Sequence, residues 1–102
     1  MNQTADKAKQ KLTVWKYHFG LKEYEELEMP AGATILKVAT QGIPTLWALV
    51  DPAAQVEKRT LLIAGTGSAI TESKSRLIYL DTIFNVDKTL VFHVFEIVAE
   101  VE

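Results

Sequence analysis

Apolar positions along this chain recur mainly with the two-residue period of β-strands, and turn-forming residues interrupt them about every ten positions. The predicted strands are Leu12–Phe19, Tyr24–Met29, Thr34–Thr40, Ile43–Val50, Val56–Ala64, Ser75–Phe84 and Thr89–Val98. Short strands at this spacing are typical of all-β domains. The pattern therefore predicts an all-β fold of about seven strands, either an antiparallel sandwich or a small barrel.

Three of the strand segments are apolar on both faces: Ile43–Val50, Thr60–Ala64 and Leu90–Val98. A sheet with one wet face alternates apolar and polar residues, whereas here Leu46 projects opposite to Trp47 and both are apolar. Both faces must then be covered, and a chain of 102 residues has little material for a second covering layer. We therefore expect a homo-oligomer in which another copy covers part of this surface.

Turn residues predict how some strands pair. Gln41-Gly42 predicts a hairpin between Thr34–Thr40 and Ile43–Val50, and the segment Asn85–Lys88 predicts a second hairpin between the last two strands. Tyr24–Met29 is expected to pair with the first strand as an acidic edge strand, because its glutamates discourage edge-to-edge aggregation.

Length and the polar N-terminus indicate one domain. We expect a flexible N-terminal segment over residues 1–11 and a single β-rich domain over residues 12–102. Met1–Lys11 is polar and has no apolar run behind it, so it is typical neither of a signal peptide nor of a membrane span. The sequence therefore predicts a soluble protein that does not bind membranes.

Charge and composition exclude further classes of protein. The formal net charge of -2 gives no general attraction to nucleic acid or to acidic membranes. The chain has no cysteine, which excludes a disulfide framework, thiolate catalysis and a thiol-rich zinc site. An absence of cysteine fits a reducing compartment, and we expect a cytoplasmic location.

A glycine-rich loop is the main candidate binding site. Gly65-Thr66-Gly67-Ser68 follows an apolar strand and offers unencumbered backbone N–H groups and two hydroxyls, as a phosphate-binding nest does. Nearby cations favour an anion at such a loop. The alternative is an ordinary structural turn, because the loop lacks the lysine of a P-loop and no helix follows it. The candidate ligand-binding residues are Gly65, Thr66, Gly67, Ser68, Arg59 and Arg76.

Catalytic and metal chemistry have little support in the sequence. His93 and Glu96 are an odd number of positions apart on one strand, so they project from opposite faces and cannot share a metal. Ser68, His93 and Asp81 form a nominal triad, but Ser68 lacks the context of a nucleophile elbow. We therefore expect no catalytic residue, no metal and no cofactor, and we interpret His93 as a hydrogen-bonded core or interface residue.

Aromatic and acidic clusters each allow two interpretations. Trp15, Tyr17 and Phe19 share one strand face, as in base-stacking platforms, but the neighbouring glutamates favour a core or an interface and argue against nucleic acid. Trp47 is likewise interpreted as core in preference to a ligand clamp. The acidic run from Glu23 to Glu28 is either a solvated edge or a decoy surface for a basic host protein.

Several short motifs together resemble a known family. The motifs are Trp15-Lys16-Tyr17, Pro30-Ala31-Gly32-Ala33 followed by Ile35-Leu36, Gln41, Leu46–Pro52, Gly65-Thr66-Gly67 and Leu90–Glu96. The chain resembles short uncharacterised proteins encoded in bacteriophage genomes and prophages, described only as a domain of unknown function. The resemblance covers roughly residues 13–97 and implies a phage or prophage origin, without implying catalytic residues.

These observations favour a phage-encoded, non-enzymatic binding protein that inhibits a bacterial defence system in the host cytosol. One mechanism is capture of a small phosphorylated signal such as a nucleotide. A second is occupation of a basic site on a host defence protein by the acidic edge. A structural or assembly role in the virion is a third hypothesis, of a different class.

Overall fold

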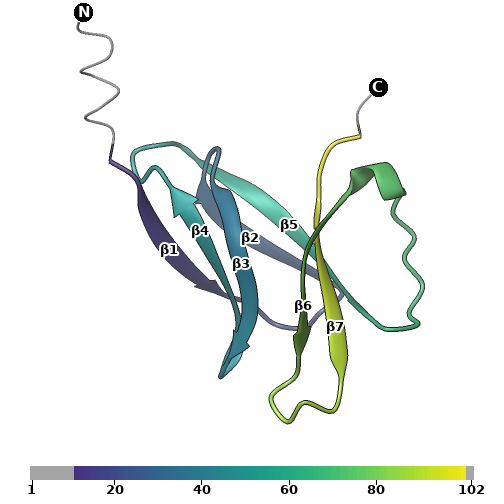
Figure 1. The fold of residues 1–102 in the computed structure, drawn as a ribbon. Helices are drawn as coiled ribbons and strands as arrows, with labels where there is room; N and C mark the ends of the chain where they lie inside the picture. The colour runs from purple at the N-terminus through teal and green to yellow at the C-terminus, as the bar shows by residue number, and fades with distance from the viewer. Residues whose placement is uncertain (1–10, 101–102) are drawn as a thin grey trace, which may run out of the picture.

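A computed structural model describes residues 11–100 as seven β-strands and one short 3-10 helix, and the predicted flexible segment lies almost entirely outside these residues (Figure 1). The elements are β1 (Thr13–His18), β2 (Tyr24–Pro30), β3 (Thr34–Gln41), β4 (Ile43–Val50), β5 (Val56–Gly65), η1 (Lys74–Arg76), β6 (Leu77–Phe84) and β7 (Val91–Ile97). The predicted all-β class is confirmed. No helix within residues 11–100 is long and apolar enough to cross a membrane.

The strands form two antiparallel sheets in a sandwich-like arrangement. Sheet A has the order β1-β4-β3 and sheet B the order β2-β5-β7-β6. Both predicted hairpins are confirmed, because β3 pairs with β4 and β6 with β7. Gly42 adopts a φ of 76°, a conformation that glycine reaches without steric cost, in the tight connection between β3 and β4.

The predicted pairing of the first two strands is wrong. β1 pairs with β4, whereas β2 pairs with β5. Opposite charges accompany the pairing of β2 with β5: Glu28 lies opposite Lys58 in the register, and the Lys58 ammonium lies 3.5 Å from the Glu26 carboxylate. β2 is an edge strand, as predicted, but it is the edge of the other sheet.

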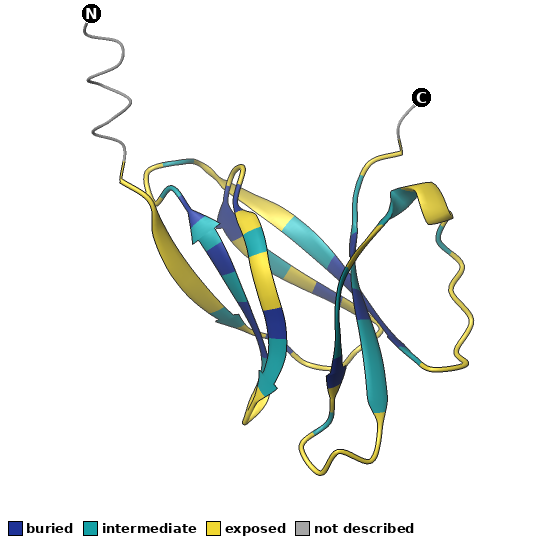
Figure 2. Ribbon diagram, viewed as in Figure 1, coloured by how far each residue is buried: buried dark blue, intermediate teal, exposed yellow. Residues whose placement is uncertain are grey.

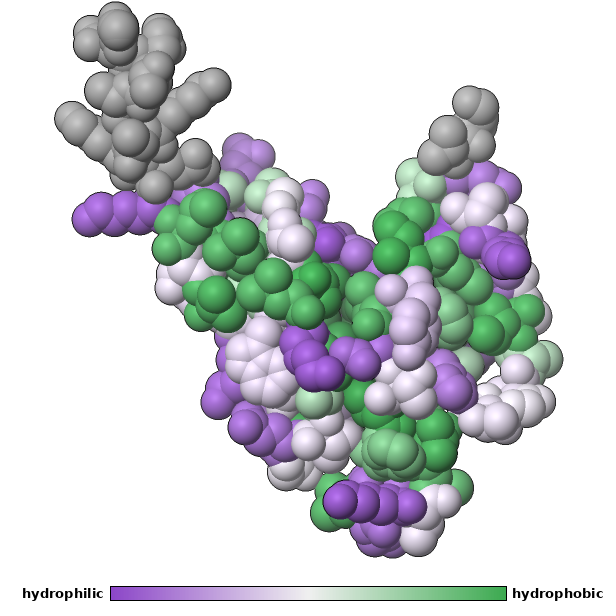
Figure 3. Space-filling view, in the orientation of Figure 1, coloured by the Kyte–Doolittle hydropathy of each residue, from purple (hydrophilic) through white to green (hydrophobic). Residues whose placement is uncertain are grey.

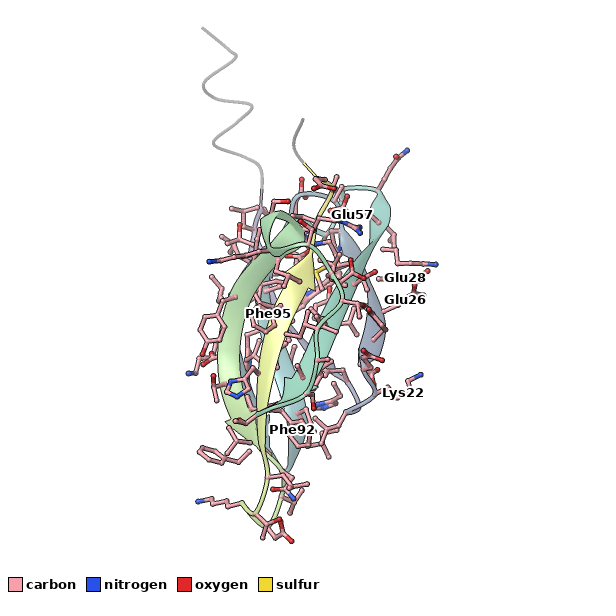
Figure 4. All side chains as sticks on the ribbon, turned by 90° about the vertical axis from the view of Figure 1, so that its right-hand side faces the viewer. Lys22, Glu26, Glu28, Glu57, Phe92 and Phe95 are labelled. Atoms are coloured by element: carbon pink, nitrogen blue, oxygen red, sulfur yellow. The ribbon has the colours of Figure 1, made fainter. Side chains whose placement is uncertain are left out.

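The chain covers part of its own two-sided apolar surface. β5 and β6 both run antiparallel to β7, which lies between them, so the segment 66–76 must return to the start of β6. Figures 1 and 4 show this segment passing over the outer face of sheet B. Leu62 and Ala64, on that face of β5, are buried. This crossover loop, residues 66–76, therefore covers the outer face of β5.

The core lies between the two sheets (Figure 2). Alternate residues of β4 (Leu46, Ala48 and Val50) face Leu61 and Ile63 of β5 in one apolar cluster. The other buried members are Phe19, Met29, Ala33, Val38, Ile83 and Val94. The inward half of each two-sided strand thus supplies the core, as the two-residue period of a strand requires.

Trp47, which the sequence places in the core, is half-buried on the outer face of sheet A. Its neighbours Leu46 and Ala48 are fully buried, so alternation turns Trp47 outward. It lies between Lys16 and Lys37 in the register of β1, β4 and β3. Aliphatic stems of lysines can cover part of an aromatic ring in this position.

An ion pair inside the sandwich links elements from three parts of the chain. Arg59 of β5 binds both carboxylate oxygens of Glu96 on β7 through Nε and Nη2, and the Nη2–Oε1 distance is 3.1 Å. Arg59 Nη1 also donates to the Ala33 carbonyl oxygen at 2.9 Å, just before β3. The hydrogen bonds to Glu96 raise the pKa of the Arg59 guanidinium, so the guanidinium stays charged.

We expect Glu96→Ala to lower the free energy of unfolding by about 3 kcal/mol, because it leaves the largely buried guanidinium with only the Ala33 carbonyl oxygen and the more distant, exposed Glu57 carboxylate, 3.6 Å away. The double variant Arg59→Met with Glu96→Leu should be much less destabilised, since neither charge remains. Urea unfolding followed by circular dichroism measures both. Equal losses in the single and double variants would show that packing, and not the charge pair, is the important contribution.

The Tyr17 hydroxyl is buried without a hydrogen-bond partner among the described residues, and burial raises the pKa of this phenol above its ordinary value of 10.0. We expect Tyr17→Phe to raise the free energy of unfolding by about 1 kcal/mol, because an orphaned buried hydroxyl costs more than it contributes. The native phenol keeps its proton above pH 10, so stability falls as pH rises further, and the variant should lose less stability over this pH range because Tyr24, whose pKa is also raised, remains. Urea titrations at pH 7 and above pH 10 test both statements.

Candidate functional site

The Gly65–Ser68 loop is a hydrogen-bonded β-turn. Ser68 N donates to the Gly65 carbonyl oxygen at 3.0 Å, and Gly67 has a φ of 90° at the third position of the turn. A positive φ there is characteristic of a type II turn, which explains the need for glycine. Because the Ser68 N–H is used within the turn, the loop has one fewer donor for an anion than a nest would need.

His93 lies beside this turn on the outer face of sheet B. Its Nε2 lies 2.7 Å from the Thr66 hydroxyl and its Nδ1 3.1 Å from the Thr82 hydroxyl, which in turn lies 2.6 Å from the Tyr79 hydroxyl. Both ring nitrogens are thus occupied by threonines. Glu96 points to the opposite face, as the spacing predicts.

The nominal triad of Ser68, His93 and Asp81 is not assembled. His93 lies opposite Thr82 in the register, so Asp81, one position earlier on β6, projects into the sandwich. There Asp81 accepts a hydrogen bond from Val38 N at 3.2 Å. Among the described residues, no group of three or more histidine, aspartate or glutamate side chains could hold a metal ion.

The structure does not bring Arg59 and Arg76 to the Gly65–Ser68 turn. Arg59 lies about 20 Å from Gly65 at the usual rise of a strand and is bound to Glu96 inside the sandwich. Arg76 lies at the far end of the crossover loop. It donates from Nη1 to Glu72 at 2.9 Å and from Nε to the Val98 carbonyl oxygen at 3.1 Å.

Two hollows flank the turn, with volumes of about 380 and 570 Å³. They share Gly65, Ser68 and Phe92, and the larger one adds Thr66 and residues 89–91. Neither lining contains a lysine or an arginine, and the smaller one includes Glu23. These hollows can accept hydroxyls and apolar groups, but they give a phosphate no counter-charge.

A third cleft, of about 340 Å³, lies where β3 and β6 run side by side, and we call it the β3–β6 cleft. It is lined by Lys37, Val38, Ala39, Thr40, Gly42, Thr82, Ile83, Phe84, Asn85, Val86 and Lys88. Side chains bridge the two strands: Lys37 lies 3.5 Å from Asp81, and the Thr40 hydroxyl donates to the Phe84 carbonyl oxygen. An apolar wall with two lysines at its margin suits an apolar ring that carries a negative group.

The β6–β7 turn holds Lys88 in place at this cleft. Asp87 accepts hydrogen bonds from the Thr89 hydroxyl at 2.7 Å and from Asn85 Nδ2 at 2.7 Å. These bonds, chiefly that from the Thr89 hydroxyl, lower the pKa of the Asp87 carboxyl. Lys88 follows with a φ of 62°, a rare conformation for a residue with a side chain. Figure 3 shows apolar side chains next to charged ones at this end of the molecule.

The acidic edge is less uniform than the sequence suggests. Glu23, Glu26 and Glu28 are exposed, but Glu25 is buried. The Glu25 carboxylate accepts a hydrogen bond from Lys22 N at 2.9 Å and thereby fastens the connection between β1 and β2. Figure 4 shows Glu26 and Glu28 at the margin of sheet B. The edge is acidic on its outer face only.

Sequence reasoning missed the β3–β6 cleft because its two lysines lie far apart in the chain. Lys37 resembles an ordinary solvated strand residue and Lys88 an ordinary turn residue. The only signal for either was the polar turn Asn85–Lys88, which predicts a hairpin and not a site. The cleft exists because the two sheets meet along β3 and β6, and no local pattern reports that contact.

Comparison with known families identifies the family of the chain. A model described as a domain of unknown function, DUF7352, matches residues 10–102. The chain belongs to the DUF7352 family. The match spans all seven strands, the Gly65–Ser68 turn and the β3–β6 cleft, so the DUF7352 domain is the whole sandwich. No curated protein and no solved structure matches the chain.

Proposed function

We propose that this DUF7352 protein is a phage- or prophage-encoded, non-enzymatic binding protein that inhibits a bacterial defence system in the host cytosol by sequestering a nucleotide-type signal. The phage origin rests on the sequence resemblance. The ligand class rests on one observation, the pair of lysines at the margin of an apolar cleft between β3 and β6. These lysines support the β3–β6 cleft as the ligand site in preference to the Gly65–Ser68 turn.

Electrostatics favours this cleft over the other two hollows. A phosphate needs cationic or N–H partners to replace its water shell. The linings beside the Gly65–Ser68 turn contain no basic residue, whereas Lys37 and Lys88 both line the cleft. Asp81 offsets part of the Lys37 charge in the free protein, and the ammonium is still largely exposed, so it can turn toward a ligand.

The size and lining of the cleft suit a nucleotide. Its volume of about 340 Å³ is within the range of small-ligand sites. A base would pack against Ile83, Phe84 and Val86, and the phosphate would lie between the lysines. Phe84 and Val86 are exposed in the free protein, so ligand binding would bury apolar surface.

The hydrogen bonds of His93 favour a binding role over catalysis. His93 has hydroxyl partners on both ring nitrogens, and neither of them is acidic. In hydroxyl–histidine catalysis a carboxylate usually orients the ring and stabilises its charged form, whereas the second partner of His93 is a threonine hydroxyl. The Thr66–His93–Thr82 arrangement instead ties the crossover loop to β6 and β7.

Calorimetry against a panel of mononucleotides, cyclic dinucleotides and ADP-ribose tests the proposal. We expect at least one of these compounds to bind, with an affinity that falls as salt is added. Lys37→Gln combined with Lys88→Asn should weaken binding at least tenfold, because both counter-charges are lost. Asparagine is chosen because it tolerates the positive φ at position 88.

Two control variants separate the cleft from other sites. Lys58→Gln removes an exposed lysine that pairs with Glu26, outside the cleft, and should leave nucleotide binding unchanged. Gly67→Val strains the turn at its φ of 90° and should lower stability without changing the affinity of the folded protein. Loss of binding in Gly67→Val, with retention in the double lysine variant, would place the ligand at the turn instead.

A second candidate function is the acidic decoy, and the exposure of Glu26 and Glu28 along the free edge of sheet B favours it. An extended basic segment of a host defence protein could add to this edge as a further strand, with its cationic side chains beside the two glutamates. Glu25 takes no part in this surface, because it is buried.

Glu26→Lys combined with Glu28→Lys should abolish co-purification of such a host protein from infected cells and leave nucleotide binding intact. Glu72→Gln is the matched control, because Glu72 is acidic but bonded to Arg76 and Tyr24 on the crossover loop. Unchanged co-purification in the double variant would eliminate the decoy.

A further inference from the structure

The edge of sheet A formed by β1 is the least covered strand of the molecule. Five of its six residues are exposed, and Figure 2 shows the strand almost entirely in the colour of exposed residues. Leu12, Val14 and Trp15 are 54%, 49% and 41% exposed. Figure 3 shows apolar side chains gathered at the end of sheet A where β1 begins. Among residues 11–100, β4 is the only hydrogen-bonded neighbour of this strand.

The two free edges at this side of the sandwich differ in their protection. β2 carries exposed glutamates, and these repel another copy of the same edge. β1 has the sequence TVWKYH, with a single central charge at Lys16 among β-branched and aromatic residues. Such a strand is a template for pairing with a further strand.

We propose that β1 pairs antiparallel with β1 of a second copy, which joins the two A sheets into one continuous sheet. The two-fold symmetry restricts the register. Residues directly opposite each other in an antiparallel pair project from the same face, and a two-fold axis through the sheet keeps equivalent residues on the same face. The residue numbers of opposing partners must therefore add to an even number.

Charge then selects among the even registers. A two-fold axis that passes beside Lys16 places the two copies of this lysine opposite each other, which is unfavourable. A two-fold axis beside Val14 pairs only the first three residues of β1 with the other β1, and the rest of the strand extends beyond the other β1. A two-fold axis at Trp15 places Trp15 opposite its own copy, Val14 opposite Lys16, and Thr13 opposite Tyr17, so no like charges oppose and all of β1 except His18 is paired with the other β1.

This register also explains why Trp15 is exposed. Trp15 lies opposite Ala48, a fully buried residue, so it faces the inside of the sandwich, but as part of the outermost strand it has no neighbour beyond it. In the proposed dimer the two Trp15 rings meet at the axis and connect the two cores. Paired aromatic side chains across strands contribute beyond their buried area. The occupant of this edge is thus a second copy of the chain.

Opposite charges at position 14 test the register. Val14 projects to the outer face and is half exposed, so Val14→Glu and Val14→Lys place equally polar residues at a site that the fold tolerates. In the dimer each new side chain faces Lys16 of the other copy, and the two-fold symmetry produces this contact twice. We expect Val14→Glu to tighten the dimer and Val14→Lys to weaken it, with dissociation constants that differ by about tenfold or more in analytical ultracentrifugation.

Disulfide formation tests the axis. The chain has no cysteine, so Trp15→Cys introduces a single thiol that faces its own copy and should oxidise to a covalent dimer at micromolar concentration. Val14→Cys, which faces Lys16, should not. A monomer at high micromolar concentration, equal effects of the two Val14 charge variants, or faster oxidation of Val14→Cys than of Trp15→Cys would each overturn the proposal. Far-UV circular dichroism confirms that each variant is folded.

Discussion

The ion pair of Arg59 and Glu96, together with its bond to Ala33, is the buried polar contact that links sheet B to the start of sheet A. The guanidinium lies between β5 and β7 and also reaches the carbonyl oxygen of Ala33, at the point where the chain leaves sheet B for sheet A. A charge in the sandwich is tolerable only where its hydrogen bonds are satisfied. Arg59 and Glu96 lie on neighbouring strands of sheet B, so the pair neutralises both charges within that sheet, and the bond to Ala33 ties the start of sheet A to it.

Around this contact the two sheets meet without a shared backbone ladder. β3 and β6 run side by side, but side chains join them: Asp81 binds Lys37 and Val38, and Thr40 binds the Phe84 carbonyl. A closed barrel would have filled this line with backbone hydrogen bonds. The sandwich leaves it partly open, and the β3–β6 cleft is the result. The candidate binding site is thus a consequence of how the sheets close.

The outer faces of the strands that are apolar on both sides are covered in different ways across the molecule. The outer face of β5 is covered by the crossover loop, which is held in place by Glu72 with Tyr24 and by Thr66 with His93. The outer face of β4 is covered only partly, and Trp47 lies there between Lys16 and Lys37 in the register. Within residues 11–100, no strand pairs with the free edge of β1. Intramolecular packing thus accounts for sheet B better than for sheet A.

The sequence by itself determined the strands, the two hairpins and the opposite faces of His93 and Glu96, because these follow from local periodicity and turn chemistry. Only the tertiary structure decided that β2 pairs with β5, that Trp47 faces outward, that Arg59 is bound by Glu96, and that Lys37 and Lys88 share a cleft. These features depend on contacts between residues far apart in the chain. Strand periodicity states which residues share a face, but not which strand or sheet lies opposite, and that choice is made by the free energy of the whole packing.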